Sequence, residues 1–301
     1  MNIFRRHKNK TNADTWTIPI GIFEQSSVAG QDSRFVSLRT ALESETYMHA
    51  KTPLSFPIGR NEFGDFVIAD FHELSHIIAG GQTGSGKSSF TEGALLASLI
   101  YRNSPEDLKL ILIDPKMVQF SQYNDLPHLL RPVITTPEQS HKAMNWLLGE
   151  MEDRFEILAR AKKRDIVAYN SKAKVRMPYI SLVIDEVSDL MMVDGEYYEE
   201  SFIKLLQKSK AVGIHMYIGT SRPSEDIYPE LLRANFTTAL AFKTASSVDS
   251  QVMLNADGAE KLIGKGDAII TSPFTDFKPL HIQVPYSSEE EQVKLVNYIN
   301  R

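Results

Sequence analysis

Short apolar runs alternate with longer stretches of helical periodicity from about residue 76 to the end of the chain. The short runs are bounded by turn residues, which predicts buried strands. Within 138–161, Met144, Leu147, Met151 and Leu158 recur at the spacing of helical turns, which predicts a helix with one apolar face. This alternation is typical of an α/β fold with a mostly parallel sheet flanked by helices. We expect strands at 76–80, 108–114, 179–185, 215–219, 239–242, 267–271 and 280–284, and helices at 88–101, 138–161, 196–211 and 288–299.

The first 75 residues follow a less regular pattern. Residues 1–30 are irregular and begin with a basic stretch, so we expect a flexible basic arm there. Residues 31–75 carry turn signals at 51–53 and 59–64, which predicts a short α+β segment that packs on the main domain.

Composition excludes several classes of protein. The chain has 301 residues and no cysteine, which rules out disulfides and cysteine-based metal or nucleophile sites and fits a cytoplasmic location. No apolar run reaches the roughly 18–20 residues that a membrane-spanning helix needs. The basic N-terminus lacks a following apolar stretch and is therefore not a signal peptide.

The charge is unevenly distributed along the chain. The formal net charge is −5, so the composition as a whole does not indicate nucleic-acid binding. Basic residues nevertheless gather within 160–176, where Asp165 is the single acid. This cluster fits a contact with phosphates as well as it fits an ordinary solvated surface. Its members are Arg160, Lys162, Lys163, Arg164, Lys172, Lys174 and Arg176.

Residues 81–88 match the phosphate-binding pattern G-x-x-x-x-G-K-[ST] in full. The loop follows an expected strand and opens an expected helix, as this motif requires. Its glycines let backbone N–H groups approach phosphate oxygens, and the helix N-terminus adds partial positive charge. Lys87 would neutralise the β- and γ-phosphates of ATP, and Ser88 would ligate Mg²⁺. The predicted nucleotide-binding residues are Gly81, Gln82, Thr83, Gly84, Ser85, Gly86, Lys87, Ser88 and Ser89.

A second motif, Asp185-Glu186, ends the expected strand at 179–185. In P-loop ATPases the first acid of such a pair holds Mg²⁺, so Asp185 is the expected partner of Ser88. Glu186 would orient and deprotonate the attacking water. With Lys87, these two acids are the predicted catalytic residues. Asp114 also ends an apolar strand, where it could serve the site or cap the next turn.

The stretch His72-Glu73-Leu74-Ser75-His76 matches the zinc-protease pattern H-E-x-x-H. That chemistry needs both histidines on one face of a helix. Because His76 opens an expected strand, we expect the helical geometry to be lost.

Together these blocks resemble the motor domain of the FtsK/SpoIIIE DNA translocases. The resemblance covers roughly residues 35–285 and is far more specific than the phosphate loop alone. It is carried by residues 36–39 with 55–59, 76–88, 112–116 with 126–130, 151–155, 169–170, 177–179, 185–191, 213–215, 222–224, 234–235, 249–250, 258–260 and 264–267.

The resemblance implies a RecA-like P-loop ATPase domain, which we place at 76–301. It also implies a homohexameric ring around double-stranded DNA, with ATP bound between subunits and DNA pushed by loops in the channel. We expect this chain to work without the membrane-spanning N-terminal part and the DNA-reading winged helix of full-length members. We therefore expect a small motor for conjugative transfer or for partition of a plasmid or chromosome, working with a membrane-anchored or relaxase-type partner.

Two positions depart from the family pattern. Ser221 stands just before Arg-Pro-Ser, where members usually have a glutamine that can sense the γ-phosphate. Ala239 stands where members tend to have an arginine that reaches the neighbouring subunit's ATP. Either Arg222 or Arg233 takes over that role, or hydrolysis is slow or conditional. Two alternatives to a DNA motor follow: a protein-export ATPase of the type VII kind, and a weakly hydrolysing regulatory subunit of such a ring.

Overall fold

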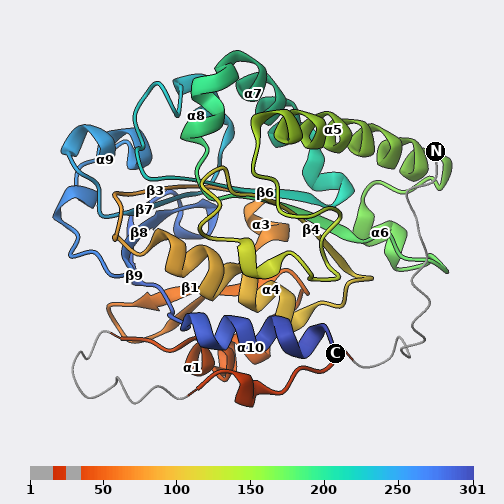
Figure 1. Cartoon of the computed structure of the whole chain (residues 1–301), viewed down its shortest axis with the longest axis horizontal. Helices are drawn as coiled ribbons and strands as arrows, with labels where there is room; N and C mark the ends of the chain where they lie inside the picture. The colour runs from red at the N-terminus through yellow and green to blue at the C-terminus, as the bar shows by residue number, and fades with distance from the viewer. Residues whose placement is uncertain (1–15, 25–34) are drawn as a thin grey trace.

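The computed structural model describes residues 16–24 and 35–301, so most of the expected basic arm lies outside the described residues (Figure 1). Nine strands of the described chain form one sheet in the order β2-β1-β9-β8-β7-β3-β6-β5-β4. Their bounds are β1 Ser55–Asn61, β2 Phe66–Asp70, β3 His76–Gly80, β4 Leu108–Ile113, β5 Tyr179–Ile184, β6 Ile214–Thr220, β7 Ala239–Phe242, β8 Asp267–Thr271 and β9 Leu280–Gln283.

Helices cover both faces of this sheet (Figure 1). The α-helices are α1 Leu38–Leu42, α2 Glu45–Met48, α3 Phe71–Leu74, α4 Ala97–Arg102, α5 Pro137–Arg160, α6 Ile166–Asn170, α7 Ser188–Lys208, α8 Glu230–Asn235, α9 Ser247–Leu254 and α10 Glu289–Ile299. A π-helical segment, η3, spans Ser89–Leu96 and leads into α4. Short 3₁₀ turns lie at η1 Ile20–Ile22, η4 Ser121–Tyr123, η5 Ser209–Val212, η6 Ala259–Lys261 and η7 Pro273–Thr275.

The sheet has a parallel half and an antiparallel half. Strands β7, β3, β6, β5 and β4 run parallel, as the sequence predicts. Strands β8, β9, β1 and β2 extend the sheet with antiparallel pairings. The expected N-terminal segment therefore contributes two strands to the same sheet, while its boundary at residue 75 stays a prediction.

Two hydrophobic cores fill the spaces between the sheet and its helices. Alternate residues of β3 point to opposite cores: Ile77 and Ala79 pack with η3, α4 and α10, whereas Ile78 packs with α5 and α7. Because the parallel strands are covered on both faces, their sequences are almost continuously apolar. The strand ends therefore lie at the edge of a sheet that is packed on both faces.

Most predicted elements are confirmed, and the differences have local causes. The expected helix at 88–101 is divided into η3 and α4. The expected helix at 196–211 begins earlier, because α7 starts at Ser188 and continues across a kink at Asp194 (φ −154°, ψ 67°). Gly213, at φ 73°, follows the turn η5 that ends this stretch. Ser288 is the N-cap of α10, so this helix begins one residue later than expected.

The histidine pair at 72 and 76 does not share a helix. His72 lies in α3 and His76 opens β3, with Ser75 at φ 68° between them. The nitrogen Nδ1 of His76 accepts a hydrogen bond from the backbone of Met216 at 3.1 Å. Among the residues that the structure describes, no helix combines the length and apolar character needed to cross a bilayer.

Candidate nucleotide site

The phosphate-binding motif forms the connection between β3 and η3. Gly84 and Gly86 have φ values of 78° and 110°, a region that favours glycine. A Cβ atom on Gly86 would lie 2.2 Å from the backbone nitrogen of Gly266. That nitrogen donates to the carbonyl of Ser85 at 2.9 Å. The loop at 264–266 therefore packs directly against the motif, and Lys265 and Gly266 line the cavity beside it.

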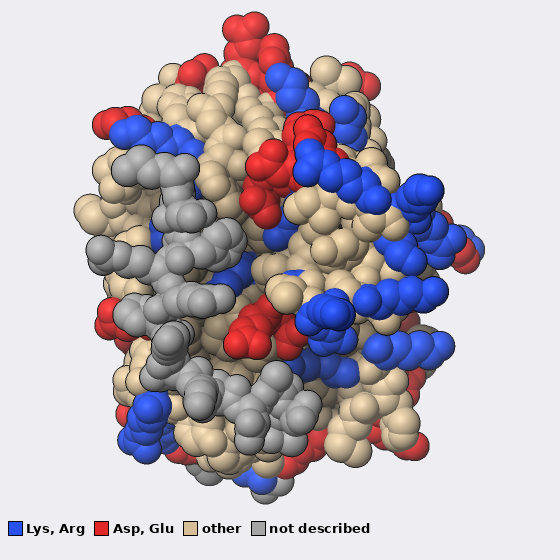
Figure 2. Space-filling model, turned by 90° about the vertical axis from the view of Figure 1, so that its right-hand side faces the viewer, with Lys and Arg blue, Asp and Glu red and all other residues tan. Residues whose placement is uncertain are grey.

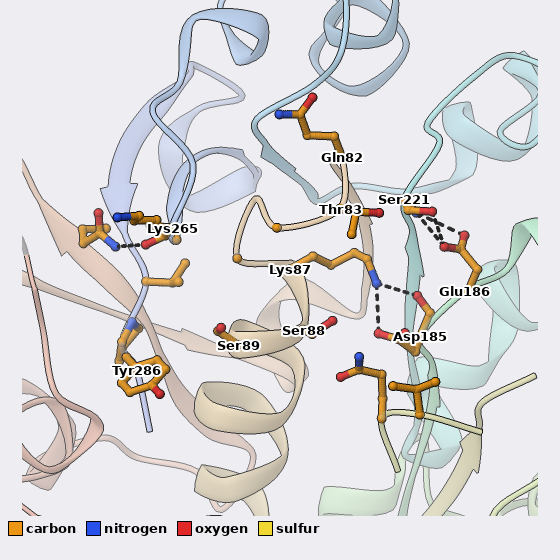
Figure 3. A pocket seen from close by; sticks show the side chains of 18 of the residues that line it. Gln82, Thr83, Lys87, Ser88, Ser89, Asp185, Glu186, Ser221, Lys265 and Tyr286 are labelled. Atoms are coloured by element: carbon orange, nitrogen blue, oxygen red, sulfur yellow. Dashed lines mark hydrogen bonds and ion pairs between the residues drawn. The ribbon is translucent and has the colours of Figure 1, made fainter. Parts of the chain in front are cut away.

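A cavity of about 540 Å³ opens beside this loop (Figure 3). It brings together predicted residues from the loop, the strand-end acids and Ser221, whereas Gly81 and Ser85 are buried behind the loop surface. The predicted residues that line it are Gln82, Thr83, Gly84, Gly86, Lys87, Ser88, Ser89, Asp185, Glu186 and Ser221.

Lys87 reaches from the loop to the end of β5. Its Nζ donates to the carbonyl oxygen of Asp185 at 2.8 Å and to Oδ1 of the same residue at 2.9 Å (Figure 3). Both side chains are buried. The parallel order β3-β6-β5 places the carboxyl ends of these strands at one edge of the sheet, which brings residues 98 positions apart into contact.

Glu186 is surrounded by hydrogen-bond donors. Oε1 accepts from Thr220 Oγ1 at 2.6 Å, Ser188 Oγ at 2.8 Å and Ser221 N at 3.1 Å. Oε2 accepts from Ser221 N at 2.9 Å, from the Ser221 hydroxyl and from Lys116 Nζ at 3.1 Å. Burial raises the pKa of Glu186, but the hydrogen bonds from Ser221, Thr220 and Ser188 outweigh it and lower the pKa to about 2. The carboxylate is therefore held ionised.

The structure gives Ser221 a contact that the sequence did not predict. Its hydroxyl faces Glu186 (Figure 3). Lys116, from the loop after β4, was also missed as a site residue. Burial lowers the pKa of Lys116, but the hydrogen bond and the charge of Glu186 outweigh this effect and raise the pKa. The available signal was the stretch Asp114-Pro115-Lys116 directly after an apolar strand.

Asp114 serves as a turn cap, one of its two expected roles. Its Oδ2 accepts hydrogen bonds from the backbone nitrogens of Gln119 at 2.8 Å and Phe120 at 3.0 Å. These bonds hold the loop that carries Lys116.

Part of the cavity lining is apolar and was not predicted. Val118, Val284, Pro285 and Tyr286 contribute to it, and the ring of Tyr286 lies 5.5 Å from that of Phe35. These residues come from three distant parts of the chain, so no local pattern points to them.

The two candidate arginines lie outside the residues that line this cavity. Arg222 is exposed and pairs with Asp226. Arg233 donates to the carbonyl of Val252 at 3.1 Å and, with Ala239, lines a separate cavity of about 290 Å³. Neither arginine contributes to the nucleotide cavity of its own chain.

The amino-acid sequence of this chain is similar to those of a known protein family. Residues 37–225 match the FtsK/SpoIIIE family. A protein of Campylobacter jejuni named DNA translocase FtsK is 41% identical over 276 residues, which cover 90% of this chain and 29% of that protein. A protein of the same name from Clostridium acetobutylicum is 38% identical over 277 residues, covering 90% of this chain and 36% of the relative.

Solved structures confirm the predicted RecA-like P-loop fold. The conjugation coupling protein TcpA of pCW3, solved with ATPγS, matches with a TM-score of 0.73 and 22% identity, over 88% of this chain and 74% of that one. The cytoplasmic domain of the type VII secretion ATPase EccC of Thermomonospora curvata matches with a TM-score of 0.74 and 22% identity, over 88% and 34%. The arrangement of the loop and the acids agrees with the family match, and we conclude that the chain belongs to the FtsK/SpoIIIE family.

Proposed function

We propose that this chain binds ATP with Mg²⁺ and couples ATP hydrolysis to movement along double-stranded DNA. The observation that carries the proposal is the meeting of Lys87, Ser88, Asp185 and Glu186 in one cavity of an FtsK/SpoIIIE chain. The chain spans 29% of the Campylobacter jejuni relative, whose name, DNA translocase, supports the choice of DNA as the load.

The residues present fit a nucleotide with its metal ion. Backbone N–H groups of the loop would bind phosphate oxygens, and Lys87 would exchange its contact with Asp185 for the β- and γ-phosphates. The hydroxyl of Ser88 and the carboxylate of Asp185 line the same cavity and are the oxygen ligands that Mg²⁺ prefers. When bound there, Mg²⁺ supplies positive charge that neutralises the phosphates. The apolar wall at Val284 suits an adenine ring.

A basic surface supports DNA as the load. Figure 2 views the end of the molecule that carries α6 and the C-terminal end of α5, and Lys and Arg side chains gather there. Lys162, Lys172 and Lys174 are exposed on this end, and Lys163 is half-buried. A phosphate backbone would be attracted to such a surface even though the net charge of the chain is −5.

Assembly into a homohexameric ring is part of the proposal. An arginine from one copy would then reach the ATP of the next. Arg222 is the better candidate, because it is exposed and its side chain pairs with the exposed Asp226, whereas the backbone of Val252 holds Arg233. Ala239→Arg tests the missing contact. If the wild type lacks a trans arginine, we expect ATP turnover to rise roughly ten-fold or more. An unchanged rate in an assembled ring would show that the contact is already supplied.

The main experiment measures ATPase activity with and without duplex DNA, together with displacement of a triplex-forming strand. We expect DNA to stimulate hydrolysis and the strand to be displaced, and Lys87→Ala to lose both activities. A basal rate that DNA does not change, with no displacement, would contradict the proposal. Retention of a secreted peptide in place of DNA would favour the protein-export alternative.

The cellular setting that we propose is DNA transfer or partition in the cytoplasm, with a membrane-anchored or relaxase-type partner. The fold shared with a conjugation coupling protein fits this setting. If Lys87→Ala left the process intact in cells, hydrolysis would be dispensable, and the chain would act as a regulatory subunit.

A further inference from the structure

The hydrogen bonds on Glu186 use all of its acceptor capacity. An ionised carboxylate has about four lone-pair sites. Here its two oxygens receive contacts from Thr220, Ser188, Ser221 and Lys116. A general base must direct a free lone pair at the proton it accepts. In this arrangement Glu186 therefore has none to offer to an attacking water.

Lys116 is the contact that is easiest to remove. Its side chain is 49% exposed, against 2% for that of Glu186, and it lines the nucleotide cavity. The hydroxyls of Thr220 and Ser188, in contrast, come from buried residues at the end of β6 and the start of α7. Of the donors on this carboxylate, Lys116 and Ser221 line the cavity, and Lys116 is the one whose charge would attract an entering phosphate.

Lys116 is not needed to fold its own loop. Asp114 already fixes that loop through the backbone nitrogens of Gln119 and Phe120. Next to Lys116, Met117 adopts φ 55°, and Met117 and Val118 are 67% and 68% exposed. The pairing of Lys116 with Glu186 thus contributes little to the loop, and its significance lies in the site.

We propose that Lys116 is a positioning residue that holds Glu186 in this saturated arrangement and transfers to the γ-phosphate when a nucleoside triphosphate binds. The transfer would withdraw the positively charged donor from Oε2 of Glu186, which leaves that oxygen with Ser221 alone and makes it easier for an attacking water to reach. It would also place a second cation, besides Lys87, on the phosphate that is to be cleaved. This inference rests on the proposed ATP site, and it makes γ-phosphate binding and the release of Glu186 a single event.

A double-mutant cycle on nucleotide affinity tests the exchange without relying on activity. Affinities for ATPγS and ADP are measured by calorimetry for the wild type, Lys116→Met, Glu186→Gln and the double variant. We expect Lys116→Met to weaken ATPγS binding roughly ten-fold, since a charge-assisted contact is lost, and to leave ADP binding unchanged. Glu186→Gln should tighten ATPγS binding several-fold, but only where Lys116 is present.

Controls separate this inference from a folding defect and from the proposed function. Lys204→Met removes an exposed lysine that pairs with Glu200 on α7, and it should change neither affinity. Lys116→Arg should retain the preference for ATPγS. Equal losses for ADP and ATPγS, or an effect of Glu186→Gln that is the same with and without Lys116, would overturn the exchange. A wild type that binds neither nucleotide would instead contradict the proposed function.

Discussion

At the scale of single residues, Gly84 and Gly86 differ in how much room their surroundings leave for a Cβ atom. Both have positive φ, but a Cβ on Gly84 would meet no heavy atom within 4 Å. A Cβ on Gly86 would clash with the backbone of Gly266, which is bonded to Ser85. The two glycines lie in the same loop, yet of the two only Gly86 is needed for close packing of the loop at 264–266.

We expect the two alanine substitutions to differ in severity. Gly84→Ala should lower the free energy of unfolding by about 1 kcal/mol, because the left-handed backbone conformation is the only source of strain. Gly86→Ala should lower the free energy of unfolding by at least about 2 kcal/mol more, because the loop at 264–266 must also move. Urea unfolding and ATPγS binding check this order. Equal losses of stability for both variants would show that the contact with Gly266 does not constrain the loop.

At the scale of elements, a partly buried chain of polar side chains connects the helix after the phosphate loop to α10. Glu92 of η3 accepts a hydrogen bond from Gln122 at 2.9 Å, and Gln122 also donates to Gln292 of α10 at 2.9 Å. Burial, followed by the negative charge of Asp185, raises the pKa of Glu92 to about 8. Glu92 is therefore protonated over much of the range in which an ordinary glutamate is ionised.

This shift predicts a pH dependence of stability. Between the ordinary pKa of 4.5 and the folded value of about 8, the folded state holds a proton that the unfolded state has released. The free energy of unfolding therefore falls as pH rises through that window. Glu92→Gln removes the titration, so the variant should gain roughly 1–4 kcal/mol over the wild type between pH 5 and pH 8.5. Urea unfolding at both pH values measures this difference.

The matched control for this prediction is Glu200→Gln, an exposed position on α7. It should show no such gain. A Glu92→Gln variant whose stability stayed parallel to the wild type from pH 5 to pH 8.5 would contradict the raised pKa.

At the scale of the whole molecule, the nucleotide cavity and the basic surface lie at opposite ends of β5. Asp185 follows the strand, whereas Arg176 comes shortly before it and pairs with Asp107. Six residues of strand separate the two ends by about 20 Å. DNA at the basic surface would therefore act on the nucleotide through the sheet and α5, and not by direct contact.

We expect replacement of the four lysines of this surface to weaken DNA binding without affecting nucleotide binding. In the combined variant, Lys162, Lys163, Lys172 and Lys174 each become Glu. A plot of log affinity for duplex DNA against log salt concentration has a negative slope. Its magnitude should decrease by roughly 2–4, since each phosphate contact contributes about 0.9. ATPγS affinity should stay unchanged. Replacing Lys204 and Lys208 of α7 by Glu is the control, and an equal loss in both variants would reject a specific role for the surface.

The sequence alone predicted the elements that form the parallel half of the sheet. The strand at 239–242 has the observed bounds, because it is an uninterrupted apolar run between turn residues. The short helices α6, α8 and α9 were missed, since five to eight residues give too little periodicity to recognise. The early start of α7 was missed, and the expected start at 196 lies just after the kink at Asp194.

The nucleotide motif was recognisable because its chemistry is local: eight consecutive residues supply the turn, the cation and the hydroxyl. The surroundings of Glu186 could not be recognised in the sequence, because its partners Lys116 and Ser221 lie 70 and 35 residues away along the chain. The order of parallel strands brings the ends of β4, β5 and β6 together, and no local pattern encodes that order. The sequence alone therefore determined that this chain carries a nucleotide site, whereas the tertiary structure alone decided which side chains control its acid.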